Sequence, residues 1–529
     1  MMRKQKTILI LLALILALSA IIAACGKNEP APETTGSSSE ADAGESETGT
    51  ELPDVAGRFT VGFARKECMP DGGDSVIMSN YGVKRYSTGY YNKIYVHCIA
   101  MTDTAGTTFL CYSLDISGTA NLSVFNNIKT EIQKQYGIAP EYIHLPNTHN
   151  HSAVALGADG SECPANHIYI QKLVRVAVEV AGEALADRKE ATIEVGTGQA
   201  EGLTYVRHYR MSDGSIRTDN YNSSYGKTVE YAAHANTGEP DRSIQLIRFN
   251  RTEGKDIVMV GFRSHNHLQG GSKNTDLMGG FPVAMMESME AQDPEIYAVY
   301  YQQDAGRLNP TSHLDSESIT EDLSTPTLEF YGEKLAGYAL EGLKHMEPAE
   351  TGLIKTVSYV FTGNTNRVKK ELISEATVIY QQFQSGAITS SEGMKLCVEK
   401  NNELGLSYID GLHSVYHCGA IISNSSNPVT LNLTLYAVSI GPDIGLTYSA
   451  YEMFDSNGRY IREQSPFKMT MTICYNDGTN GEQSAGYLPD EEAWGYGCYE
   501  ADRAVYAPGT AEQLADRYIE LLKELKASY

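Results

Sequence analysis

The sequence predicts an α/β fold in which a mixed β-sheet is flanked by helices. The main observation is that short strand-like apolar runs alternate with longer runs of helical apolar spacing, an order typical of α/β domains. The composition agrees, because 42% hydrophobic and 20% charged residues are ordinary values for a globular protein. The 529 residues suffice for one large domain or for two or three smaller ones, and we find no internal repeat.

The N-terminal segment has a basic start, an apolar run and a cysteine. Three basic side chains among the first six residues precede the apolar residues 8–24, a run too short for a comfortable transmembrane helix. Together with Cys25 this segment resembles a bacterial lipoprotein signal, with a signal peptide over residues 1–24 and a lipid on the Cys25 thiol. We therefore expect a lipid-anchored protein on the extracytoplasmic face of a bacterial cell membrane. A plain signal-anchor is the alternative.

Residues 25–57 are predicted to form an acidic, flexible tether. Between Lys27 and Ala56 there are eight acidic residues and one lysine among many Ser, Gly, Pro and Thr, a composition that cannot bury enough apolar surface to fold. The globular part is expected over residues 58–529. The formal net charge of -24 makes anionic polymers poor partners, so we exclude nucleic-acid binding.

Four strands and two helices are predicted in the first half of the globular part. The strands are apolar runs rich in β-branched and aromatic residues, at 59–64, 91–103, 107–117 and 141–146. The helices have apolar residues three and four positions apart, at 122–136 and 167–187.

The second half continues the alternation. Strands are predicted at 191–200, 243–250, 256–262, 295–303 and 468–477, with a strand pair over 429–445. Helices are predicted at 325–345, 369–402 and 511–526, and the second of these belongs to a possible helical insertion at about 366–420.

Metal-capable side chains follow the ends of four predicted strands. They are His149 with His151, His265 with His267, Asp304, and Asp477. Ligands of open α/β sheets bind at the carboxyl ends of strands, so these clusters form one site hypothesis. A hydrolytic zinc ion takes three or four nitrogen or oxygen ligands and keeps a position open for water, and two histidines from separate strands plus a carboxylate fit that pattern.

His149 and His151 are two residues apart, which bears on how many of them reach a metal. We expect one ligand, His149, and one neighbour that handles protons, His151, unless the loop bends. As the alternative, the His-x-His pattern is fortuitous, or one histidine is a buried polar group with ordinary partners.

The eight cysteines after Cys25 show no Cys-x-x-Cys spacing, so no zinc ribbon is indicated. Some of them could pair outside the membrane, but the sequence does not say which. Cys98 and Cys111 lie in strand-like runs and are expected to be small buried hydrophobic residues.

Five stretches, in order, resemble the catalytic domain of the neutral (non-lysosomal) ceramidase family. They are NTHNHS at 147–152, GFRSHNH at 261–267, DAGRLNP at 304–310, IGPDIGLTYSAYEMF at 440–454 and GYLPDEEAWGYGCYE at 486–500. Each is a weak signal alone, but their common order over residues 58–529 is a specific one.

The resemblance implies a zinc amidase with a defined set of site residues. Zn²⁺ would be bound by His149, His265, Glu452 and Tyr487. His151 and Tyr499 would flank the scissile carbonyl, and Arg207 would contact the anion or carbonyl. Four alternatives stay open: Glu452 as a helix N-terminal acid, Tyr487 as a packing residue, His267 as the ligand instead of His265, and Arg207 as a surface base. Asp115 and Asp276 are expected to be structural.

The chain departs from the family at three places. Asn309 stands where ceramidases have a serine, and Asn cannot act as the same nucleophile or proton donor. Ala450-Tyr451 replaces the Pro-Gly that precedes the family's glutamate. The β-sandwich that follows the ceramidase catalytic domain is expected to be missing, since 30 residues follow Tyr499 (529 minus 499).

Together these features predict an extracytoplasmic zinc-dependent hydrolase that cleaves an N-acyl amide, with a ceramide-like lipid among the candidate substrates. His151 would transfer the proton near its ordinary pKa, and Tyr499 and Arg207 would stabilise the oxyanion. One alternative is a non-catalytic ligand-binding lipoprotein on the same fold. Another is a zinc hydrolase of cell-wall amides or of esters. The oligomeric state is not predicted.

Overall fold

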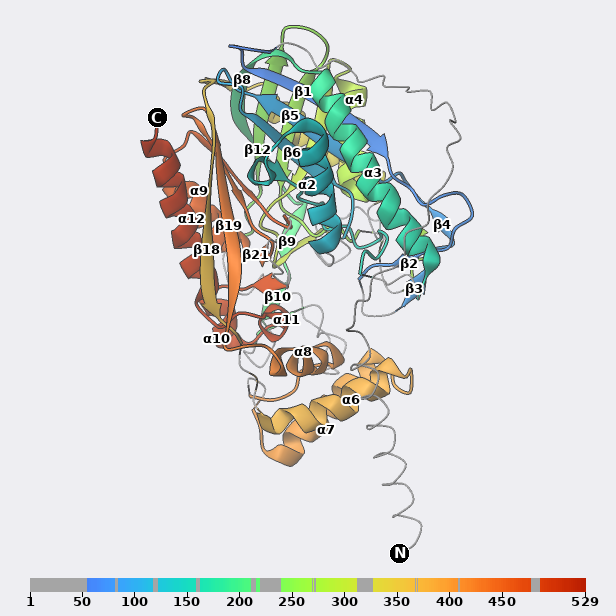
Figure 1. Cartoon of the computed structure of the whole chain (residues 1–529). Helices are drawn as coiled ribbons and strands as arrows, with labels where there is room; N and C mark the ends of the chain where they lie inside the picture. The colour runs from blue at the N-terminus through green and yellow to red at the C-terminus, as the bar shows by residue number, and fades with distance from the viewer. Residues whose placement is uncertain are drawn as a thin grey trace, which may run out of the picture. The chain divides into compact units, whose positions relative to one another are not determined.

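The structure is a computed structural model (Figure 1). It describes residues 55–80, 84–117, 122–157, 162–210, 216–218, 239–268, 270, 273–311, 327–366, 368, 370–407, 410–476 and 486–529. The predicted signal peptide, Cys25, most of the predicted tether and Asp477 lie outside the described residues. Within the described part, no helix is both long and apolar enough to span a membrane.

The larger sheet is mixed, as the sequence predicts. Its strands follow the order β15-β13-β12-β8-β1-β5-β6-β7, and β17 pairs with β8 at one side. The pairs β13–β15 and β6–β7 are parallel, while the other neighbours are antiparallel. In chain order the strands are β1 Thr60–Glu67, β5 Tyr95–Thr102, β6 Thr108–Leu114, β7 Ile143–His144, β8 Lys189–Gln199, β12 Ser243–Arg251, β13 Asp256–Phe262, β15 Ile296–Gln302 and β17 Glu347–Ala349.

Helices cover one face of this sheet, and Figure 1 shows α2 and α3 crossing in front of its strands. Because side chains alternate along a strand, Cys98 and Ala100 of β5 pack against α2 and α3, whereas Ile99 and Met101 face the opposite side. Helices α4 and α5 cover β12, β13 and β15 on the same face as α2 and α3. These helices are α2 Leu122–Tyr136, α3 Pro164–Ala186, α4 Phe281–Gln292 and α5 Leu328–Leu343.

A second, four-stranded sheet packs on the other face, and helices α9 and α12 cover its outer side. Its order is β18-β19-β20-β22, with only β20 and β22 parallel. The sequence predicts most of these strands but not that they form a separate sheet. The elements are β18 Ile354–Asn364, β19 Thr430–Ile440, β20 Ile444–Tyr448, β22 Met469–Ile473, α9 Asp455–Gln464 and α12 Thr510–Ala527.

A group of three helices connects β18 to β19 and has its own small apolar core. Residues 369–402, which the sequence predicts to be helical, are helical but interrupted: α6 ends before Gly386, whose φ is +74°, and a capping box at Thr389 starts α7. Helix α8 packs on the short helix α11, Tyr499–Arg503. The elements are η3 Lys370–Leu372, α6 Ile373–Gln384, α7 Ser390–Leu404 and α8 Val415–Ser425.

Short strands and turns at the ends of the two sheets supply most of the candidate site. They are β2 Ile77–Met78, β3 Arg85–Tyr86, β4 Gly89–Tyr90, η1 Pro140–Tyr142, β9 Thr204–Val206, β10 His208–Arg210, β11 Ile216–Thr218, β14 Asp276–Leu277, β16 Leu308–Pro310, β21 Glu452–Met453, β23 Tyr487–Leu488 and α10 Glu491–Tyr496. All eight cysteines after Cys25 are buried free thiols, so the expectation for Cys98 and Cys111 is confirmed.

Candidate metal centre

The loop after β7 bends at His149 and brings two imidazoles together. Asn147 shapes the bend: its side-chain oxygen accepts from the His149 N–H at 3.0 Å, and its amide donates to the Tyr475 carbonyl at 2.6 Å. His149 itself has φ of +51°, a left-handed conformation that is rare outside glycine. The bend leaves the Nε2 atoms of His149 and His151 only 3.1 Å apart, so both histidines face the same point.

His265 reaches that point from the segment after β13. Its Nδ1 lies 2.9 Å from the Leu308 carbonyl oxygen, and since a carbonyl can only accept, Nδ1 carries the proton and Nε2 presents its lone pair. That Nε2 lies 3.2 Å from Oε2 of Glu452. His267 instead places Nε2 3.0 Å from the Asn309 side-chain oxygen. The structure therefore brings His265, rather than His267, to the cluster.

Glu452 and Tyr487 face each other across two short parallel strands, β21 and β23, whose register pairs these two residues. Their side chains are hydrogen bonded, and this bond lowers the pKa of Glu452, although burial outweighs it and raises that pKa overall. Glu452 is not the N-terminal acid of a helix, since α9 begins only at Asp455. Its carboxylate points at the histidines, with Oε2 also 3.6 Å from Nε2 of His149.

The donor atoms fit a divalent cation. Candidate ligand atoms of His149, His151 and His265 all lie within 4.8 Å of one another. The carboxylate oxygen of Glu452 lies 3.2 Å from Nε2 of His265 and 3.6 Å from Nε2 of His149, close to the roughly 3.3 Å edge of a tetrahedron with bonds of about 2.0–2.1 Å, the zinc geometry. The lone pair of His265 also faces a carboxylate oxygen, an arrangement that needs a proton or a cation between the two atoms.

Burial keeps the imidazoles of this cluster neutral. It lowers the pKa of His149 and of His265 to about 3, and it lowers the pKa of His151 well below the ordinary value, with neighbouring histidines adding to the effect on His149 and His151. Neutral imidazole is the form that binds metals. The expectation of a near-ordinary pKa for His151 is therefore wrong, because the ring is largely withdrawn from solvent and lies against other histidines.

Arg207 and Tyr499 lie beside this cluster. The Arg207 guanidinium carbon is 5.3 Å from the ring centre of Tyr487 and 5.6 Å from that of Tyr499, and the two rings are 5.7 Å apart edge to face. Arg207 is only 3% exposed, so the alternative of a surface base is wrong. Tyr499, at the start of α11, completes an aromatic and cationic wall next to Glu452 and Tyr487.

Asn309 is held in one orientation by its neighbours. Its side-chain oxygen accepts from Nη1 of Arg207 at 3.3 Å, and His267 Nε2 lies 3.0 Å from the same oxygen. Its amide nitrogen is thereby turned toward the Tyr205 hydroxyl at 3.5 Å. Register places Asn309 of β16 opposite Tyr205 of β9, two residues before Arg207. The side chain is thus a fixed hydrogen-bonding group at the edge of the cluster.

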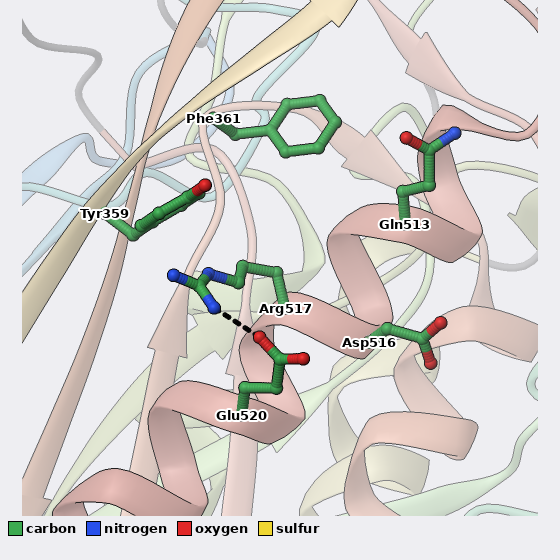
Figure 2. A pocket seen from close by; sticks show the side chains of 6 residues that line it. All are labelled: Tyr359, Phe361, Gln513, Asp516, Arg517 and Glu520. Atoms are coloured by element: carbon green, nitrogen blue, oxygen red, sulfur yellow. Dashed lines mark hydrogen bonds and ion pairs between the residues drawn. The ribbon is translucent and has the colours of Figure 1, made fainter.

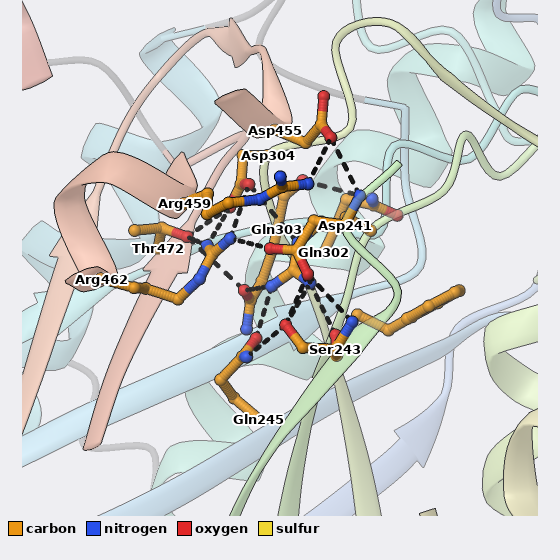
Figure 3. A network of polar contacts seen from close by, with 12 residues as sticks. Asp241, Ser243, Gln245, Gln302, Gln303, Asp304, Asp455, Arg459, Arg462 and Thr472 are labelled. Atoms are coloured by element: carbon orange, nitrogen blue, oxygen red, sulfur yellow. Dashed lines mark hydrogen bonds and ion pairs between the residues drawn. The ribbon is translucent and has the colours of Figure 1, made fainter. Parts of the chain in front are cut away.

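Asp304 does not belong to the cluster, contrary to the sequence analysis. It is fully buried in an ion-pair network with Arg263, at 3.4 Å, and Arg462, at 2.8 Å, which Asp241 joins (Figure 3). Buried charges require such partners, and two arginines distant in the sequence supply them. Asp115 and Asp276 also remain outside, with Asp115 accepting from the Tyr95 N–H at 3.0 Å.

Two other groups among the described residues resemble ligand sets, and in both the donor atoms have internal partners. Glu500 contacts Arg207 and His208, while Asp502 contacts His413 at 2.6 Å and His417 of α8 at 3.6 Å. A surface hollow lies elsewhere, between β18 and α12 (Figure 2). Its lining residues, Tyr359, Phe361, Gln513, Asp516, Arg517 and Glu520, include none of the candidate site residues.

Comparison with known proteins identifies the fold. No family model matches the chain, and no curated protein sequence matches it. Among solved structures, the neutral ceramidase from Pseudomonas aeruginosa superposes with a TM-score of 0.63 at 13% identity, covering 90% of this chain and 75% of that one. A ceramidase complexed with C2 gives the same TM-score and identity, with 76% of that chain covered. The protein therefore has a neutral-ceramidase-like fold.

Proposed function

We propose that the protein is a zinc-dependent hydrolase that cleaves an N-acyl amide such as an N-acylated lipid. The proposal is carried by one observation: candidate donor atoms of His149, His151 and His265 lie together, and Oε2 of Glu452 lies 3.2 Å from His265 and 3.6 Å from His149. Tyr487 is hydrogen bonded to Glu452, and Arg207 lies beside Tyr487. The likeness in fold to two ceramidase structures supports it. The two observations are independent, since one concerns side chains and the other the backbone.

His149, His265, Glu452 and Tyr487 would hold the ion. When bound, Zn²⁺ supplies Lewis-acid polarisation of the scissile carbonyl and makes nearby water more acidic. His151 is the group we assign to proton transfer, because its Nε2 faces the cluster 3.1 Å from that of His149. Burial keeps its ring neutral, so it can accept the proton of the attacking water and pass it to the leaving nitrogen.

Arg207 and Tyr499 would stabilise the negative charge that develops on the carbonyl oxygen. Hydrogen-bond donors and positive charge aimed at that oxygen lower the barrier most when they are fixed in a buried site, and Arg207 is fixed and buried. Asn309 has no nucleophilic atom, so water is the attacking group. The role of Asn309 is to hold the substrate and the guanidinium in place.

We further propose that the domain acts outside the cytoplasm, anchored by a lipid on Cys25. The basis is the sequence of residues 1–25 together with the acidic segment that follows. An anchor of this kind would keep the domain at a membrane surface, where N-acylated lipids are concentrated.

The purified protein should be tested on short-chain N-acyl-sphingosine, simple N-acyl amides, cell-wall amides and matched esters, with released acid and amine measured by mass spectrometry. Hydrolysis of an N-acyl amide that a chelator abolishes and added zinc restores is the expected result. Zinc-loaded protein that cleaves none of these amides would contradict the proposal.

The second candidate is a non-catalytic ligand-binding lipoprotein. Asn309 favours it, because this residue replaces the serine expected from the resemblance. A binding protein would retain an N-acyl amide intact and would release it unchanged on unfolding, so the same mass measurement separates the two candidates.

A further inference from the structure

Arg207 is held by a buried carboxylate that the sequence analysis did not single out. Its Nε donates to Oε1 of Glu500 at 2.6 Å, and the two side chains are 4% and 0% exposed. Burying two charges carries a large desolvation cost unless the pair is close and its remaining hydrogen-bonding atoms are satisfied. The stability of the Arg207–Glu500 ion pair therefore depends on the other hydrogen-bond partners of Glu500.

The second oxygen of Glu500 has a partner of its own. His208, the residue after Arg207, places Nε2 3.1 Å from Oε2 of Glu500, and its Nδ1 lies 2.6 Å from the Tyr496 hydroxyl. Since a carboxylate only accepts, Nε2 of His208 donates to it, and Nδ1 of the same ring is hydrogen bonded to the Tyr496 hydroxyl. Both oxygens of Glu500 are satisfied by this chain of contacts, and Arg207 and His208 keep its pKa low.

We propose that Glu500, supported by His208 and Tyr496, is a positioning residue for Arg207 in the reaction. This inference rests on the proposed hydrolase function. The carboxylate fixes the Nε edge of the guanidinium, and Nη2 donates to the Gly306 carbonyl at 2.9 Å. These two contacts orient the Arg207 guanidinium beside the rings of Tyr487 and Tyr499, with Nη1 donating to Asn309.

The geometry explains why an arginine needs this support. Its side chain is long and flexible, whereas charge stabilisation in catalysis depends on donors that are in place before the charge develops. Glu500 does not reach the histidine cluster in any contact that we observe among the described residues. It therefore acts through Arg207, and its removal should lower turnover while zinc and substrate stay bound.

A second buried pair provides a matched control. Arg307 donates from Nε to Asp455 at 2.5 Å, with 1% and 0% exposure, the same kind of contact as Arg207 with Glu500. Neither Arg307 nor Asp455 contacts the cluster histidines in the described residues. Asp455→Asn should therefore reduce stability without reducing kcat, and it separates a general effect of losing a buried ion pair from an effect on the reaction.

The test is a double-mutant cycle in the purified, zinc-loaded protein on the N-acyl amide that it cleaves best. Glu500→Gln should lower kcat about tenfold to a hundredfold, the typical effect of lost orientation, with KM and zinc content nearly unchanged. The double variant with Arg207→Ala should lose no more activity than Arg207→Ala alone. A folded Glu500→Gln protein with wild-type kcat, or fully additive losses in the double variant, would overturn the inference.

Two further measurements keep the test decisive. Tyr496→Phe keeps the ring and removes only the hydroxyl that contacts His208, so it serves if Glu500→Gln does not fold. A several-fold fall in kcat that disappears in the Arg207→Ala background supports the inference. An unchanged kcat in Tyr496→Phe overturns it. If the wild type cleaves no N-acyl amide, the proposed function fails, and a crystal structure of Glu500→Gln or Tyr496→Phe decides this inference separately. Arg207 displaced from Tyr487 and Tyr499 supports it, and Arg207 unmoved overturns it.

Discussion

Replacing Asn309 by alanine should slow hydrolysis by about tenfold to a hundredfold. Asn309 accepts one hydrogen bond from the charged Arg207 and lies 3.0 Å from Nε2 of His267. A hydrogen bond to a charged group contributes about 1.5–3 kcal/mol and a neutral one about 0.5–1.5 kcal/mol. If only the charged bond bears on the transition state, the barrier rises by about 1.5–3 kcal/mol, and each 1.36 kcal/mol is tenfold in rate.

The rate loss of Asn309→Ala is to be compared with that of His151→Ala. His151→Ala removes the proposed proton carrier and should cost about a hundredfold to ten-thousandfold. The assay measures initial rates on N-acyl-sphingosine and on simple N-acyl amides, with zinc content determined for each variant. If Asn309→Ala abolishes activity as completely as His151→Ala while zinc is retained, Asn309 takes part in the chemistry and the reasoning is refuted.

Asn309→Ser tests the substrate class in the same assay. Ceramide cleavage that appears only with the serine would mean that the natural substrate is another N-acyl amide. Efficient ceramide cleavage by the wild type would refute the inference that Asn309, in place of the serine, makes ceramide a poor substrate.

Three further predictions concern stability and anchoring. A Cβ on Gly306 would lie 2.5 Å from the Glu452 carbonyl oxygen, so Gly306→Ala should lower the free energy of unfolding by about 1–3 kcal/mol and weaken zinc retention. Gly337→Ala, in α5 with no atom within 4 Å of the new Cβ, should instead stabilise by up to about 1 kcal/mol, and equal urea midpoints for the two variants would contradict this. Burial raises the pKa of Asp115 to about 8 from about 3.9 in the unfolded chain, so the folded state binds more protons and stability falls as pH rises between these values. Asp115→Asn should flatten this fall of stability with pH, so that the urea midpoints of the variant at pH 5 and pH 8 differ less than those of the wild type. An equal fall in the variant and the wild type would contradict the prediction. Labelled lipid precursors should be incorporated by the wild type but not by Cys25→Ala, and equal labelling would refute the lipoprotein prediction.

Local patterns in the sequence predict most strands and helices, whereas sheet membership depends on long-range pairing. The apolar run over residues 95–102 marks β5 correctly, because both faces of this strand are buried against other elements. Nothing local shows that β19 and β22 belong to a second sheet. The break at Gly386 was likewise missed, since the apolar spacing on its two sides continues a helical pattern.

In the candidate site, too, local patterns predict some features, whereas others depend on contacts between distant segments. The strand-end rule brings His149 and His265 together, but the direction of His151 depends on the left-handed backbone of His149, which no spacing rule predicts. Asp304 obeys the same rule and yet lies in an arginine network, because its partners come from distant segments. Glu500 ends the stretch GYLPDEEAWGYGCYE and His208 directly follows Arg207, but only the fold reveals that they contact each other.

The zinc content of purified protein tests the central claim most directly. Elemental analysis by mass spectrometry should find about one zinc ion per chain in the wild type, as a single tetrahedral site requires. His149→Ala and His265→Ala should each remove it, while His413→Ala, a buried histidine of a different group, should retain it. Full zinc occupancy in both site variants, or loss of zinc only in His413→Ala, would contradict the assignment of the metal centre.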